Sequence, residues 1–231
     1  MEHPDDRAWR MKSEEASDRR IASLNHSILS SLSPEALAEV YGGETSASRD
    51  YETEFLLEME REILRGNPLW AIEQLDLERQ LRSHVSAAIW ALRGLANLAL
   101  GRWADAISDA DMALMEDANF APSYAIKAEA ALREGDYVWA LIQADHALSL
   151  NPDEPRGLGV RAAACYQSGR LEEAVQAGTR ALALISNWAL PREARALAYR
   201  KLGQVNEAKA EARILLESDA ENEVARYLLR A

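Results

Sequence analysis

The chain has 231 residues, 48% of them hydrophobic, and a formal net charge of −12. Such a chain can bury a sizeable core in one domain or two, whereas its negative charge argues against a partner made of nucleic acid or anionic lipid. The single cysteine, Cys165, excludes an internal disulfide and a multi-cysteine zinc site. The first residues show neither the basic start nor the apolar core expected of a signal peptide, and no apolar run is long enough to cross a bilayer. We therefore expect a cytoplasmic protein without direct membrane insertion.

Residues 1–50 are predicted to form a partly flexible helical arm. Apolar residues recur at mostly three- and four-residue steps between Ser13 and Leu32, which indicates an amphipathic helix. Ser33-Pro34 is typical of a helix start, and the short helix it begins is expected to end at Gly42-Gly43. The Thr-Ser-Ala-Ser stretch at 45–48 is predicted to be a linker.

A helical hairpin is predicted for residues 51–86. An apolar pattern from Asp50 indicates a helix, and Gly66-Asn67-Pro68 breaks it. Leu69, Ile72 and Leu75 are expected to continue the apolar side on a second helix. Repeat-like spacing from Gly66 and the large Met59 at a small-residue position make this a degenerate unit of the repeat that follows.

From Ala87 to Asn222 a unit of 34 residues repeats four times, over 87–120, 121–154, 155–188 and 189–222. Four columns of small residues recur in phase: Gly101, Gly135, Gly169 and Gly203; Ala106, Ala140, Ala174 and Ala208; Ala110, Ala144, Gly178 and Ala212; Gly94, Ala128, Ala162 and Ala196. A fixed period of this length indicates a repeat architecture. The glycines are predicted to end each first helix with a positive φ, and residues 223–231 to form a capping helix.

These columns resemble the tetratricopeptide repeat family. Unit 121–154 is the closest match, with Tyr124, Ala128, Ala140, Ala147 and Pro152 at family positions, while the other units depart mainly in their aromatic residues. The resemblance implies an all-α fold, a right-handed α-solenoid of helix-turn-helix hairpins, here with an N-terminal helical extension and a C-terminal capping helix.

Each unit carries a basic residue immediately before the small residue of its first helix. These residues are Arg93, Lys127, Arg161 and Arg195. We expect them to pair with carboxylates on second helices, such as Asp109 or Asp111, although exposed pairs contribute little to stability.

The resemblance also implies that the first helices line a concave groove that binds a peptide or a partner helix. Carried over to this chain, the predicted groove consists of Leu95, Leu98, Ala125, Glu129, Leu132, Arg133, Arg156, Tyr166, Gln167, Glu193, Leu197, Arg200 and Lys201. Its early part, where Ala88 and Ala91 also face inward, is nearly uncharged and suits an apolar strip or the protein's own N-terminal helix. Its later part is net basic, which favours a partner with apolar anchors and carboxylates. The alternative is that these are ordinary solvated side chains.

Three tryptophans and the cysteine have separate interpretations. Trp9 and Trp139 are candidates for a secondary interface, because exposed tryptophans mark contact surfaces. Trp188 is expected to pack locally, and Cys165 to be a small buried hydrophobe rather than a nucleophile.

No catalytic, cofactor-binding or metal-binding residues are predicted, because the histidines lack ligand spacing and no phosphate loop or nucleophile elbow is present. The leading hypothesis is a non-enzymatic scaffold or adaptor for another protein within a larger complex. Two alternatives stay open: a dedicated chaperone of a secreted or assembling protein, and a peptide or small-molecule sensor with the N-terminal arm as a lid. The partner and any self-association are left open.

Overall fold

The computed structural model describes residues 46–82 and 84–230. The predicted helices before residue 45, and Trp9 with them, lie outside these residues. Within the described part the chain forms eleven α-helices and no strand. They are α4 (Ser46–Leu64), α5 (Pro68–Leu81), α6 (Ala87–Ala99), α7 (Trp103–Glu116), α8 (Ala121–Glu134), α9 (Tyr137–Leu150), α10 (Pro155–Gln167), α11 (Leu171–Leu184), α12 (Ala189–Lys201), α13 (Val205–Ser218) and α14 (Glu223–Arg230).

The start of α4 corrects one prediction. The sequence pattern predicts a linker at 45–48, but residues 46–48 are helical. Serine costs less than about 0.7 kcal/mol relative to alanine in a helix, so two serines do not stop a helix that the following residues favour. On α5 the expected apolar side is right for Leu75, which is fully buried, and wrong for Leu69, whose side chain is exposed. Ala71 takes the inward position instead.

Each hairpin turns at a glycine in the left-handed region. Gly101, Gly135, Gly169 and Gly203 have φ between 71° and 83°, and Gly66 in the degenerate hairpin has φ of 91°. The backbone N–H groups after each first helix return to its last carbonyls, as from Asp136 to Ala131, which is the usual way a glycine ends a helix. The predicted role of these glycines is confirmed.

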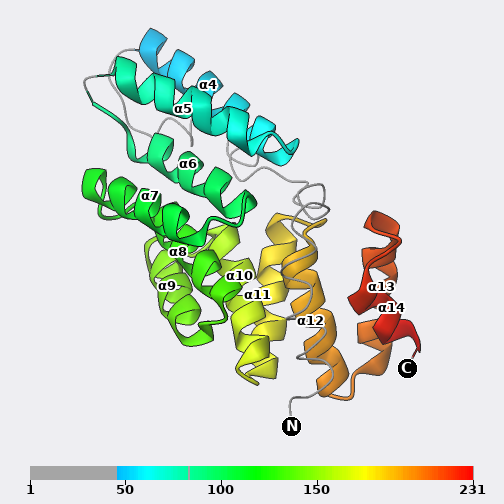
Figure 1. Ribbon diagram of the computed structural model, residues 1–231. Helices are drawn as coiled ribbons and strands as arrows, with labels where there is room; N and C mark the ends of the chain where they lie inside the picture. The colour runs from blue at the N-terminus through cyan, green and yellow to red at the C-terminus, as the bar shows by residue number, and fades with distance from the viewer. Residues whose placement is uncertain (1–45, 83, 231) are drawn as a thin grey trace.

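The hairpins stack side by side into an arc that runs from α4 and α5 to α13 and α14 (Figure 1). First helices touch first helices along the stack, from α6 to α8, α10 and α12, and each second helix packs against the first helix of the next unit. The first helices are accordingly the more enclosed: 10 of the 13 residues of α10 are buried, against 5 of the 14 in α11. The prediction of an all-α helical repeat is confirmed.

Small residues occupy the points where the helices cross. On the second helices Ala106, Ala140 and Ala174 are fully buried, and their counterparts on the first helices, such as Ala128, are fully buried as well. A methyl side chain lets two helix backbones approach closely while still filling the space between them. The last helix, α14, packs on α12 and α13 and buries its own alanine, Ala225.

Candidate functional site

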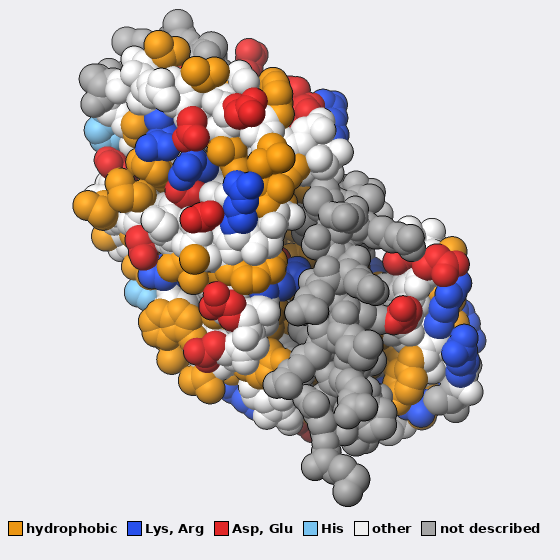
Figure 2. All heavy atoms as spheres, viewed as in Figure 1, with side chains coloured by type: hydrophobic (Ala, Val, Ile, Leu, Met, Phe, Trp, Pro, Cys, Tyr) orange, Lys and Arg blue, Asp and Glu red, His pale blue; other side chains and the backbone are white. Residues whose placement is uncertain are grey.

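A ladder of ion pairs connects neighbouring units and uses the basic residues singled out in the sequence. Arg93 pairs with Asp109 on α7 and, at 2.9 Å, with Asp76 on α5. Lys127 pairs with Asp111 at 2.7 Å. Side chains of opposite charge lie next to one another over α4–α9 in Figure 2. The expected pairing with Asp109 and Asp111 is confirmed.

The same ladder continues through the later units. Arg161 pairs with Asp145 on α9 at 2.8 Å and with Glu173 on α11 at 3.0 Å, and Arg195 pairs with Glu211 at 2.6 Å. A ladder arginine can thus connect the second helix of its own unit to that of the unit before. The ladder thus places ion pairs between helices of neighbouring units.

Most of the predicted groove is buried in this structure. Nine of its thirteen residues are buried, three are half-buried and one is exposed. The buried ones are Leu95, Leu98, Ala125, Glu129, Leu132, Arg156, Tyr166, Glu193 and Leu197; the half-buried ones are Arg133, Gln167 and Arg200; Lys201 is exposed. Ala125 and Leu132 have at most 1% of their surface exposed, and Leu132 is part of the hydrophobic core of the stack. The assignment of the thirteen residues to a binding groove stays a prediction.

The charges of the predicted groove are partly used within the protein. Glu129 on α8 accepts a hydrogen bond from Nη1 of Arg156 and one of 3.0 Å from Nη2 of Arg133. Burial alone would raise the pKa of Glu129, but the two guanidinium groups outweigh it and hold that pKa below its usual range. Both cations are therefore engaged by a carboxylate of the protein itself.

The other two cations of the predicted groove lie at the end of α12. The ammonium group of Lys201 is 4.5 Å from the ring centre of Tyr166, and the guanidinium of Arg200 is 5.8 Å from that of Tyr227. Both distances are within the range of a cation–π contact. The structure thus separates the predicted groove into a paired cluster around Glu129 and a second cationic group at the end of α12.

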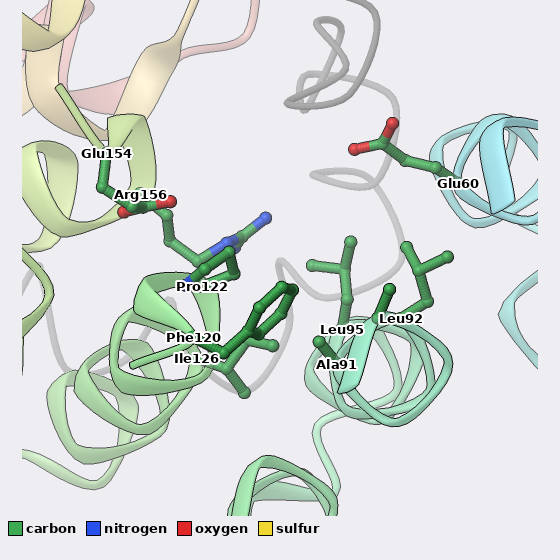
Figure 3. Close-up of a pocket in the computed structure, with 10 residues that line it drawn as sticks. Glu60, Ala91, Leu92, Leu95, Phe120, Pro122, Ile126, Glu154 and Arg156 are labelled. Carbon is green, nitrogen blue, oxygen red and sulfur yellow. The ribbon is translucent and has the colours of Figure 1, made fainter. Parts of the chain in front are cut away.

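A pocket opens between the first helices near the start of the stack. It encloses about 390 Å³ including space open to solvent, and it is lined by Glu60, Ala88, Ala91, Leu92, Leu95, Phe120, Pro122, Ile126, Glu154 and Arg156. In Figure 3 two leucines of α6 face Phe120 and Ile126 across the pocket. Glu154 and Arg156 lie at one side of the pocket and Glu60 of α4 at the other. The pocket is therefore apolar along its floor and ionisable at its rim.

Part of this lining belongs to the inner face predicted from the sequence, namely Ala88, Ala91, Leu95 and Arg156. The rest of the lining, including Phe120, Glu154 and Glu60, was not predicted from the sequence.

A signal for two of the missed residues was present at the 34-residue period. The residues immediately before α8, α10, α12 and α14 are Phe120, Glu154, Trp188 and Asn222, respectively. All four side chains are buried. We call these four residues the N-cap column, and each of them contributes a side chain to the interior of the stack.

Glu154 is the chemically unusual member of the N-cap column, because it places a carboxylate where Phe120 and Trp188 place aromatic rings. Only 1% of its surface is exposed. Its Oε2 accepts a hydrogen bond from the backbone N–H of Gly157, whereas its Oε1 is buried with no hydrogen-bond partner among the described residues. Burial raises the pKa of Glu154 to about 7, because it outweighs the backbone N–H groups of Gly157 and Arg156 and the charge of Arg156, all of which lower that pKa.

The tryptophans and the cysteine occupy different environments. Trp188 is buried and packs over Gly159, and Cys165 is fully buried, so the expectations of local packing and of a small core residue are confirmed. Burial raises the pKa of the Cys165 thiol. Trp139 is 42% exposed on α9 beside the exposed Val138 and Ile142, and its assignment to a secondary interface stays a prediction.

Residues 46–82 and 84–230 contain no group of three or more histidine, cysteine, aspartate or glutamate side chains arranged to hold a metal ion. None of the described helices is long and apolar enough to cross a membrane.

Comparison with solved structures identifies the fold. TTC0263, a thermophilic TPR protein of Thermus thermophilus, matches with a TM-score of 0.62 at 18% identity, over 78% of this chain and 100% of that one. The chain has the tetratricopeptide-repeat fold. MamA matches this repeat stack with a TM-score of 0.51 at 17% identity, over 71% of this chain and 96% of that one. YrrB, described as a TPR protein with an unusual peptide-binding site, matches with a TM-score of 0.51 at 12% identity, over 77% of this chain and 91% of that one.

Sequence comparison agrees over a shorter stretch. The chain is 39% identical over 77 residues to the TPR repeat-containing thioredoxin TTL4 of Arabidopsis thaliana. This match covers 33% of the present chain and 11% of that relative's length. No family model matches the chain.

Proposed function

We propose that this tetratricopeptide-repeat stack is a non-enzymatic scaffold that binds a segment of another protein in the pocket between α4, α6, α8 and the start of α10. The observation that carries the proposal is the lining of that pocket. Leu92 and Leu95 face Phe120 and Ile126 and form an apolar floor between stacked helices. Pockets of this kind, mostly apolar with a few polar groups that fix orientation, are where proteins hold ligands.

The similarity to solved structures supports a binding role in general terms. YrrB is described as having a peptide-binding site, and its likeness to this chain is one of fold. A rigid stack held by buried alanines and an ion-pair ladder loses little conformational entropy when a segment binds, which favours affinity. Action in the cytoplasm and the absence of catalysis are part of the same proposal.

The proposal is tested by filling the pocket. Ala91 lines it and is buried on α6, so Ala91→Trp places an indole in the space that a partner would use. Ala104→Trp on the exposed side of α7 is the matched control. Proteins captured from a cell extract by the wild type and by Ala104→Trp, quantified by mass spectrometry, should be lost from Ala91→Trp. Equal capture by all three, at equal melting temperatures, would exclude the pocket as the binding site.

A further inference from the structure

Two members of the N-cap column contact the preceding first helix. Trp188 lies against Gly159, and Nδ2 of Asn222 donates a hydrogen bond of 2.8 Å to Oε1 of Glu193. The ring of Trp188 thus makes an apolar contact, and the side-chain amide of Asn222 makes a hydrogen bond. Glu154 stands in the same column, and one of its two oxygens has no donor within the described part of the chain.

Keeping that oxygen without a donor is costly. A buried polar atom without a hydrogen bond loses its hydration and gains nothing in return, and the loss is larger for a charged group. The nearest cation in the sequence, Arg156, gives its Nη1 to Glu129. Arg133 also donates to Glu129. Both guanidinium groups of this cluster are thus directed at a carboxylate other than Glu154.

Glu154, whose Oε1 has no donor among the described residues, is also a lining residue of the pocket. Its side chain lines the pocket together with Leu95, and in Figure 3 it lies at the rim opposite Glu60. A ligand carboxylate placed here would meet Glu154 and would compete with Glu129 for Arg156, which disfavours an acidic group. A cationic group would instead supply the missing donor, and a hydrogen bond between charged groups is stronger than a neutral one.

We propose that the pocket is a subsite for a lysine or arginine side chain of the bound partner segment, whose charged end donates to Oε1 of Glu154. The alkyl part of such a side chain lies along the apolar floor, because long basic side chains bury their stems while their ends find polar partners. This inference rests on the proposed function, since it names the chemistry of the segment held in the same pocket. It also reverses the sign of partner charge that the sequence suggested.

The test is selection of a phage-displayed library of random peptides on the full chain. Three variants are selected in parallel: Ala91→Trp, which fills the pocket, Glu154→Gln, which keeps the acceptor for Gly157 but removes the charge, and Asp136→Asn. Asp136 is an exposed N-cap carboxylate on α9 that accepts from the N–H of Trp139, so its change is matched in chemistry and remote from the pocket.

The expected result has three parts. Sequences selected by the wild type and by Asp136→Asn, but not by Ala91→Trp, should be enriched in lysine or arginine beside apolar residues, and Glu154→Gln should lose this enrichment. In a synthetic copy of one selected peptide, replacing its basic residue with methionine should weaken binding to the wild type by about tenfold or more. This last measurement needs no variant of the protein, so it decides the question even if Glu154→Gln fails to fold.

The contrary outcomes distinguish failure of the basic subsite from failure of the proposed function. Pocket-dependent peptides without an excess of basic residues, or with an excess of acidic ones, would overturn the basic subsite and leave the proposed function standing. Failure to select any peptide that Ala91→Trp loses would overturn both. Selected sequences that match residues 7–12 of this chain, Arg-Ala-Trp-Arg-Met-Lys, would assign the pocket to the protein's own N-terminal segment and overturn the role of a separate partner.

Discussion

The indole ring of Trp188 lies against the backbone of Gly159, so close that a β-carbon at position 159 would be 2.7 Å from Cζ3 of the ring and closer still to Cη2. Trp188 is the N-cap of α12, and Gly159 lies on α10 of the preceding unit. Equivalent positions in the other units hold Ala91, Ala125 and Glu193. The glycine is therefore fitted to the size of its neighbour.

Gly159→Ala is expected to destabilise the protein. Alanine is favoured over glycine in a helix by about 1 kcal/mol, but overpacking of a filled core typically costs about 1–3 kcal/mol. With ring atoms inside the normal contact distance of the new methyl group, the steric cost should win. Urea unfolding of Gly159→Ala, Trp188→Leu and the double variant measures this. The double variant should be more stable than the sum of the single effects indicates, and additive effects would refute the contact.

The parts of this fold that sequence reasoning predicted are those repeated in every unit. Gly101 and its equivalents fix a backbone turn, and Ala106 and its equivalents fix a helix crossing, so four copies of each requirement are visible at one period. Such features depend on the unit itself and on its nearest neighbour alone. The ladder beginning at Arg93 was predictable for the same reason.

The pocket could not be predicted as a whole in this way, because its residues come from units that differ. Glu129 and Arg156 are 27 residues apart and pair only in their own two units, which made Arg156 look like a free cation. Glu154 replaces an aromatic residue of its column, and that substitution acquires meaning only once the structure shows one of its oxygens buried without a donor from the described residues. Departures from a repeat are individual, and their partners are set by three-dimensional packing.

Two ion pairs of the ladder, Arg93–Asp109 and Lys127–Asp111, should contribute differently to stability because their carboxylates differ in burial. The side chain of Asp109 is 3% exposed and is bonded by Arg93 and by Nδ2 of Asn97 at 2.8 Å, whereas that of Asp111 is 55% exposed beside Lys127. Removing one member of a buried pair costs about 3–5 kcal/mol, and an exposed pair is worth less than about 1 kcal/mol. Chemical denaturation of Asp109→Ala and Asp111→Ala should show this difference. Similar losses in both would contradict it.

Arg156→Met should destabilise the protein in a pH-dependent manner. Glu129 keeps Arg133 as a partner, so the loss at neutral pH should lie near the lower end of the range for a broken buried pair, about 3 kcal/mol. The pKa of Glu129 is lowered in the folded protein from 4.5, so the stability it contributes is present above that value and is lost as the pH falls through the folded pKa. The deficit of Arg156→Met should therefore shrink in acid, as measured by urea unfolding at neutral and acidic pH. A deficit that stays constant with pH would argue against the charge pairing.

Glu154 should make the protein less stable as the pH rises, which is opposite to the effect of Glu129. Its pKa is about 7 in the folded protein and near 4.5 when unfolded, so between these values the folded state holds one proton that the unfolded state has released. Stability should accordingly fall as the pH rises from 4.5 to about 7 and level off above. The free energy of unfolding should fall by about 3 kcal/mol in total over this pH range, at 1.36 kcal/mol per pKa unit.

The slope is assigned by comparing two variants. The charged groups near Glu154 are Arg156 and Glu129, and the Glu60 carboxylate also lines the pocket. Glu129 titrates below this window because its pKa is lowered. Urea unfolding across the window should give a flatter profile for Glu154→Gln than for the wild type. Asp136→Asn, which changes an exposed N-cap carboxylate on α9, is the control for the substitution chemistry. If Glu154→Gln keeps the wild-type slope, another group is responsible for the pH dependence.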